Sequence, residues 1–130
     1  MRVIALDYGS KRTGVAVSDA TGTIARPLGV VEQVATPAGL ARLCEIVREQ
    51  AAELVVVGLP LTLRGEHGKQ ARETDEFVRA LREALDIPVE TYDERFTTAI
   101  AAREAGDASE DARAAAHLLE SYLEWTRASR

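Results

Sequence analysis

Three apolar segments separated by turn residues open the chain, and they predict strands over residues 2–8, 13–19 and 24–31. The first segment is apolar at successive positions, as in a strand buried on both faces. Gly9 and the pair Thr21-Gly22 fall in the intervening turns. Short turns between consecutive strands favour antiparallel pairing, so these segments are expected to form an antiparallel meander.

Helical and strand patterns alternate after the meander. The expected elements, in order, are a helix capped by Thr36 and starting at Pro37, a strand over 54–58, a loop over 59–69, a helix through 74–85, a strand over 87–92, a short helix over 97–104, and a last helix capped by Ser109. This order predicts a single α/β domain over residues 1–130. Its sheet is mixed and five-stranded, with parallel strands after the meander and helices on both faces.

Composition narrows the functional classes. The formal net charge of −5 gives no overall positive field, so any site for nucleic acid must be a local basic patch. The single cysteine, Cys44, lies at an apolar helical position and is expected in the core, and a zinc site of His and Cys is not expected. No apolar stretch approaches the roughly 20 residues that span a membrane. With no signal-peptide pattern, the expected location is the cytoplasm.

Acidic residues from separate segments are the main chemical candidates. Asp7 ends the most buried strand, where ligands of α/β sheets bind, although its own Gly9-Ser10 turn is an alternative partner. Asp93 and Glu94 follow the fifth strand at the same edge, and only one of two adjacent extended residues is expected to reach Asp7. The Asp111 side chain points either toward the sheet or into solvent. In solvent, its negative charge at the start of the last helix would interact favourably with the helix dipole.

Carboxylates from a first strand, a later strand and a last helix are suited to Mg²⁺ or Mn²⁺, which prefer oxygen ligands. Two such ions about 3.5–4 Å apart activate water and stabilise the leaving oxygen of a phosphodiester. Asp19, at the end of the second strand, is the remaining acid. We favour a role in the Thr21-Gly22 turn over an approach to the same edge.

Basic residues near these acids are candidates for binding nucleic acid. Lys11 and Arg12 lie beside Asp7, where a phosphodiester would lie. Arg64 and Lys69 belong to the long loop over 59–69 with His67, and such loops often serve function, although a solvated loop is the alternative. Arg95 is placed to pair with an acid or with a phosphate.

Four motifs together resemble those of the YqgF family, also called RuvX, of small bacterial RNase H-like proteins. They are Ala5–Asp19, Val56–Leu61, Asp93–Thr98, and Asp111 with the apolar positions that follow it to Leu123. The resemblance covers nearly the whole chain. It implies an RNase H-like fold and a metal-dependent nuclease, with members assigned to pre-16S rRNA processing or Holliday junction resolution.

The resemblance also implies roles for particular acids. Asp7, the Asp93-Glu94 pair and Asp111 fall on the family's catalytic acids, and Asp7, Glu94 and Asp111 are the expected metal ligands. Most RNase H-like enzymes place an acid at the end of the fourth strand, whereas this chain has Gly58-Leu59-Pro60 there. An acid from the fifth strand must therefore substitute, and we favour Glu94.

Four functional hypotheses follow. The first is a nuclease with Mg²⁺ or Mn²⁺ that processes the 5′ end of pre-16S rRNA. The second keeps the chemistry but acts on four-way DNA junctions, where symmetric cuts need a dimer. The third is a nucleotide-binding module that uses Asp7-Tyr8-Gly9 as a phosphate loop, and the fourth is a non-catalytic RNA-binding ribosome-assembly factor. The sequence leaves RNA or DNA, endo- or exonuclease, and monomer or homodimer open.

Overall fold

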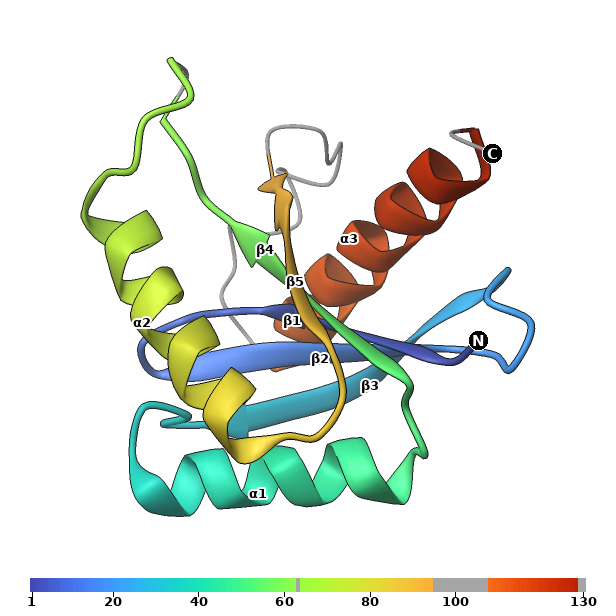
Figure 1. Cartoon of the computed structure of the whole chain (residues 1–130), viewed down its shortest axis with the longest axis horizontal. Coiled ribbons are helices and arrows are strands. Elements are labelled where there is room, and N and C mark those ends of the chain that lie inside the picture. The colour runs from blue at the N-terminus through green and yellow to red at the C-terminus, as the bar shows by residue number, and fades with distance from the viewer. Residues whose placement is uncertain (63, 95–107, 129–130) are drawn as a thin grey trace.

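The protein is an α/β sandwich in which one sheet is covered by helices on both sides (Figure 1). The computed structural model describes residues 1–62, 64–94 and 108–128. Its elements are β1 (Val3–Asp7), β2 (Arg12–Ser18), β3 (Ala25–Glu32), α1 (Pro37–Glu49), β4 (Leu54–Leu59), α2 (Lys69–Ala84), β5 (Val89–Asp93) and α3 (Ala108–Ala128). The predicted short helix over 97–104 lies outside the described residues.

The five strands form one mixed sheet in the order β3-β2-β1-β4-β5. β1 pairs antiparallel with β2, and β2 pairs antiparallel with β3, so the predicted meander is confirmed. β4 and β5 continue the sheet in parallel with β1. As a result, the carboxyl ends of β1, β4 and β5 meet the start of β2 at one edge.

One face of the sheet packs against α1 and α2. Thr36 caps α1 as predicted, because its hydroxyl accepts a hydrogen bond of 3.2 Å from the Gly39 N–H. Leu43, Cys44 and Val47 then bury one side of α1 in this core, with Phe77 and Leu81 of α2. The predicted core position of Cys44 is therefore confirmed.

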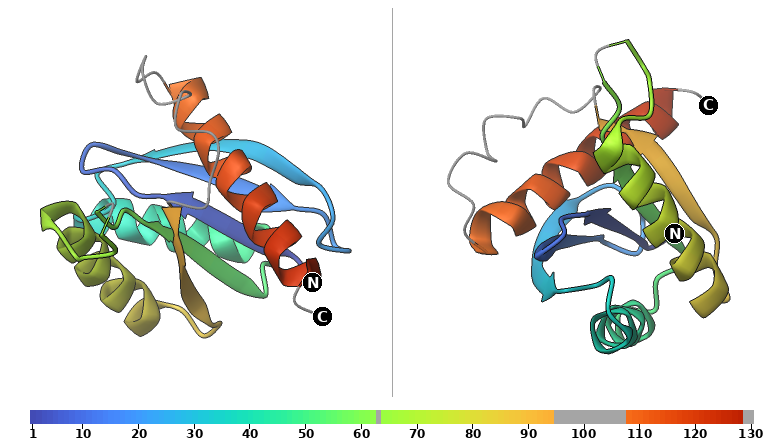
Figure 2. Two further views of the ribbon diagram at one scale, coloured as in Figure 1. Left: turned by 90° about the horizontal axis from the view of Figure 1, so that it is seen from above. Right: turned by 90° about the vertical axis from the view of Figure 1, so that its left-hand side faces the viewer.

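The other face packs against α3, which crosses the sheet diagonally (Figure 2). Its apolar side is built from alanines and leucines that include Ala115, Leu118 and Leu119. The helix begins at Ala108, one residue before the predicted cap Ser109, so Ser109 lies in its first turn. None of the helices that the structure describes is long and apolar enough to cross a membrane.

Candidate active site

The site is built around Asp7, the last residue of β1, which keeps only 9% of its surface exposed. Side chains alternate between the faces of a strand, and Val3 and Ala5 belong to the α3 side. Asp7 therefore also faces α3. Gly14 of β2 lies directly opposite Asp7. On the other side Leu6 lies beside Val57, which brings the next β4 residue, Gly58, to the level of Asp7.

Gly14 brings the start of α3 onto the sheet. A Cβ atom on Gly14 would overlap the carbonyl group of Asp111, so only glycine allows this close approach of helix and strand. Asp111 consequently lies over the direct neighbour of Asp7 on the sheet. Of the two orientations left open by the sequence, the structure has the one in which Asp111 faces the sheet. No local pattern in the sequence predicts this contact between Gly14 and α3.

Gly58 makes a similar space on the other side of Asp7, and the Glu94 side chain fills it. A Cβ on Gly58 would lie 2.5 Å from Glu94 Oε1 and 3.0 Å from a methyl group of Leu118 in α3. Glu94 thus lies on the same face as Asp7. Asp93 pairs with Leu59, and alternation along β5 directs its side chain to the opposite face.

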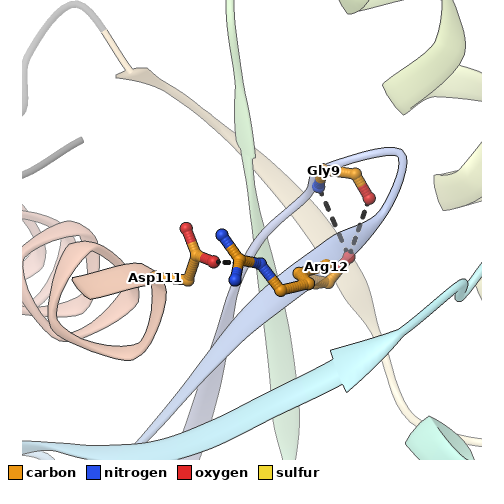
Figure 3. A network of polar contacts seen from close by, with 4 residues as sticks. Gly9, Arg12 and Asp111 are labelled. Atoms are coloured by element: carbon orange, nitrogen blue, oxygen red, sulfur yellow. Dashed lines mark hydrogen bonds and ion pairs between the residues drawn. The ribbon is translucent and has the colours of Figure 1, made fainter. Parts of the chain in front are cut away.

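An ion pair joins the start of β2 to the start of α3 (Figure 3). Arg12 Nε lies 3.0 Å from Asp111 Oδ2, with side chains 35% and 26% exposed. The turn before Arg12 is held by Thr13, whose hydroxyl lies 3.4 Å from both the N–H and the carbonyl oxygen of Gly9. A Cβ on Gly9 would overlap the Arg12 carbonyl oxygen, so this turn also requires glycine.

A small cavity of about 70 Å³ opens next to Glu94. The turn after β1 lines it through Tyr8, Gly9 and Ser10, and the first two turns of α2 line it through Gln70, Glu73 and Thr74. Pro60 and Glu94, which follow β4 and β5, complete the lining. Burial raises the pKa of the Tyr8 phenol, and the nearby carboxylates of Glu73 and Glu76 raise it further. The phenol therefore stays protonated at neutral pH.

The predicted basic residues divide between the two sides of this edge. Lys11 is exposed in the turn beside Arg12, while Arg64 and Lys69 are exposed on the loop before α2 and at its first residue. In that loop His67 Nε2 lies 3.4 Å from Asp75 Oδ2. Arg95 lies outside the described residues.

Asp19 lies away from the site. Because β2 runs antiparallel to β1, its end lies at the edge opposite to Asp7. The Asp19 carboxylate instead accepts hydrogen bonds from the Thr21 hydroxyl and from the N–H groups of Thr23 and Ile24. These bonds hold its pKa well below the ordinary range. The favoured turn role is confirmed, and an approach of Asp19 to the site is wrong.

Asp7, Glu94 and Asp111 have the ligand chemistry that a divalent cation needs, and they lie toward the same face of the sheet. Their carboxylates are not gathered into a complete set of metal ligands. Carboxylate oxygens are what Mg²⁺ and Mn²⁺ prefer, and the glycines beside Asp7 leave the space in which Asp111 and Glu94 approach it. Within residues 1–62, 64–94 and 108–128, no three acidic, His or Cys side chains are close enough to hold a metal ion. The Asp111 carboxylate is instead paired with Arg12.

Known proteins are similar to this chain in fold and in sequence. Thermus thermophilus RuvC, solved in complex with a Holliday junction substrate, is 22% identical and superposes with a TM-score of 0.61 over 98% of this chain and 96% of that one. This likeness confirms the RNase H-like fold. A Syntrophomonas wolfei protein named "Putative pre-16S rRNA nuclease" is 40% identical over an alignment of 133 positions, gaps included, that covers 95% of this chain and 94% of that protein.

A Chloroflexus aggregans protein of the same name is 44% identical over 99 residues, which cover 76% of this chain and 70% of that protein. The family model of RuvX, described as Holliday junction resolvase, matches residues 1–125. The resemblance of the four motifs is thereby confirmed. The chain belongs to the RuvX family of nucleases.

Proposed function

We propose that this protein is a divalent-metal-dependent nuclease that hydrolyses phosphodiester bonds in structured RNA, with the 5′ end of pre-16S rRNA as its substrate. The names of relatives at 40% and 44% identity support this substrate. An rRNA substrate also agrees with the cytoplasmic location expected from the sequence. The proposed metal ligands are Asp7, Glu94 and Asp111.

The observation that carries the proposal is the row of Gly14, Asp7 and Gly58 across three neighbouring strands. The backbone of Asp111 lies over the first glycine and the side chain of Glu94 lies over the second. Three carboxylates that are distant in the sequence therefore approach one face at one edge. Carboxylate oxygens are the ligands that Mg²⁺ and Mn²⁺ prefer, so their shared face favours a metal site at this edge.

The acids at this edge divide between proposed metal ligands and one structural residue. Asp7, in the middle of the row, would hold the metal together with Glu94 and Asp111 on either side. When bound, Mg²⁺ or Mn²⁺ would supply an activated water and would stabilise the leaving oxygen of the phosphodiester. Asp93 faces the other side of the sheet, so its proposed role is structural rather than catalytic.

Nucleic acid would be held by local basic groups, because the net charge of −5 is unfavourable for a polyanion. Lys11 and Arg12 lie on the β2 side of the acids. Arg64 and Lys69 lie on the α2 side and are exposed, so they are available to backbone phosphates. A strand crossing the edge between these two groups would pass over Asp7. Arg95, which follows Glu94 in the sequence, remains a candidate contact.

A second candidate substrate is the four-way DNA junction, which the description of the family model favours. The chemistry would be the same, but two symmetric cuts would require a homodimer with two sites. The oligomeric state under cleavage conditions separates the two proposals. A strictly monomeric enzyme that is active on RNA supports the rRNA substrate.

The test compares Asp7→Asn with Asp93→Asn, which removes a neighbouring charge on the opposite face. Both variants and the wild type are incubated with a pre-16S rRNA 5′-end fragment and with a synthetic four-way DNA junction, in Mg²⁺, Mn²⁺ or EDTA. We expect cleavage of the RNA only with a divalent cation. Asp7→Asn should lose at least a hundredfold in rate, a loss of about 2.7 kcal/mol of transition-state stabilisation. Asp93→Asn should stay within a few-fold of the wild type.

Cleavage by Asp7→Asn at the wild-type rate would contradict the assigned site. Tight RNA binding without cleavage of either substrate, and without any need for metal, would instead support a non-catalytic assembly factor. Micromolar binding of ATP with Mg²⁺ in a calorimetric titration would support a nucleotide-binding module.

A further inference from the structure

We propose that Arg12 holds the Asp111 carboxylate in the metal-free protein and gives it up when a divalent cation binds, which releases the guanidinium to a substrate phosphate. This inference rests on the proposed function, because it assumes that Asp111 is a metal ligand. It assigns Arg12 two successive partners at the same edge of the sheet.

The geometry places Arg12 where a competing cation would act. Arg12 is the first residue of β2, two positions before Gly14, so both face α3. Asp111 lies over Gly14 with its backbone and reaches Arg12 with its carboxylate, 3.0 Å from Nε (Figure 3). The guanidinium is therefore the counter-ion of a proposed metal ligand and lies beside the proposed metal site.

The pair has the properties of an exchangeable contact. Both side chains are partly exposed, at 35% and 26%, so water and ions reach them. A partly exposed ion pair contributes little net free energy. The attraction between Asp111 and a divalent cation that is also bound by other carboxylates is larger, so the cation can displace Arg12. A divalent cation that binds Asp111 can therefore open the pair.

Release of Arg12 would couple metal binding to substrate binding. Without metal, the guanidinium is neutralised by Asp111 and contributes little to phosphate binding. With metal, the same guanidinium is free next to the acids and can donate two parallel hydrogen bonds to a phosphate. The protein would then hold its substrate tightly only when the cation needed for cleavage is present.

The first test is calorimetric titration of Mn²⁺ into the wild type, Arg12→Gln and Arg113→Gln. Arg113 is the matched control, since its side chain is 57% exposed and lies 3.8 Å from Glu110 in the same helical turn. We expect Arg12→Gln to bind Mn²⁺ about two- to fivefold tighter than the wild type, because a competing charge is removed. Arg113→Gln should bind as the wild type does. Thermal melting of each variant confirms that it is folded.

The second test measures RNA binding by fluorescence anisotropy, in EDTA and in Ca²⁺, under conditions where the RNA stays intact. Arg12→Gln should bind as the wild type does in EDTA and more weakly in Ca²⁺. In Ca²⁺ its salt dependence should also show about one phosphate contact fewer. Arg12→Lys keeps the positive charge but lacks the planar pair of N–H donors. Its RNA affinity in Ca²⁺ should therefore lie between those of the wild type and Arg12→Gln.

Unchanged or weaker Mn²⁺ binding by Arg12→Gln would overturn the inference, since Arg12 would then position Asp111 rather than compete for it. Equal loss of RNA affinity in EDTA and in Ca²⁺ would overturn it as well. If the wild type and Asp7→Asn bind Mn²⁺ equally poorly, the proposed metal site itself fails. That result is distinct from a failure confined to Arg12.

Discussion

The Glu94 side chain lies directly over Gly58, so closely that a Cβ on residue 58 would come within 2.5 Å of Glu94 Oε1. β4 and β5 are parallel neighbours, and Glu94 is the residue after the end of β5. The fifth strand thus supplies a carboxylate above a fourth-strand position that carries no side chain of its own. This relationship supports the interpretation that Glu94 takes the place of the acid that most RNase H-like enzymes carry at the end of the fourth strand.

Replacement of Gly58 by alanine should separate activity from stability. The atoms that the new methyl group would meet belong to the flexible side chains of Glu94 and Leu118, which can move aside. We expect a loss of stability of only about 1 kcal/mol in urea unfolding. Displacement of the proposed metal ligand by about an ångström should lower kcat by roughly a hundredfold.

Gly68→Ala is the control for this substitution. Its Cβ would meet only a methyl group of Thr62, at 3.5 Å, which is ordinary van der Waals contact. Activity and stability should both stay close to those of the wild type. Equal activity of Gly58→Ala and Gly68→Ala would show that the position of Glu94 is irrelevant to catalysis.

Gly14→Ala should act mainly on the fold. Here the obstacle is the backbone of Asp111, which cannot rotate away as a side chain can. The start of α3 must shift off the sheet, at a cost of about 3 kcal/mol or more. Urea unfolding followed by circular dichroism measures this loss. A Gly14→Ala protein as stable as the wild type would show that α3 does not pack on β2 in this way.

The fold could be predicted largely from residue patterns because its signals are local. Thr36 before Pro37 is sufficient to predict the start of α1, and the apolar run at 54–58 is sufficient to predict β4. The least accurate boundaries are those with weak local signals. α2 begins at Lys69 rather than at 74, after a Gly68 that offers no side-chain cap, and β5 begins at Val89 rather than at 87.

The site was predictable only in part, because it depends on contacts between distant segments. Strand alternation predicts that only one of Asp93 and Glu94 reaches the side of Asp7, and the structure has Glu94 there. The pairing of Arg12 with Asp111 could not be predicted. It depends on where α3 begins relative to β2, and tertiary packing, rather than any local pattern, determines that position.

Asp19 provides a prediction about pH. Hydrogen bonds from the Thr21 hydroxyl and from two backbone N–H groups lower its pKa in the folded state. The ionised carboxylate therefore stabilises the fold above its ordinary pKa of about 3.9, and this contribution is lost as the pH falls below that value. Asp19→Ala should be less stable than the wild type at pH 7, and the difference should shrink at pH 3.

Denaturation curves of both proteins at the two pH values measure the effect. Cleavage by Asp19→Ala should be unchanged at a temperature where the variant is fully folded, because the turn lies at the opposite edge from Asp7. A difference in stability that does not depend on pH would show that the carboxylate charge has no part in holding this turn.

The most direct measurement of the proposed metal site is the anomalous scattering of Mn²⁺ in crystals of the wild-type protein. We predict a peak for an ion that is bound directly by carboxylate oxygens of both Asp7 and Glu94. Asp111 should have left Arg12 to join them. A Mn²⁺ ion bound through Asp93, or bound away from Asp7 altogether, would contradict the site on which the proposed nuclease depends.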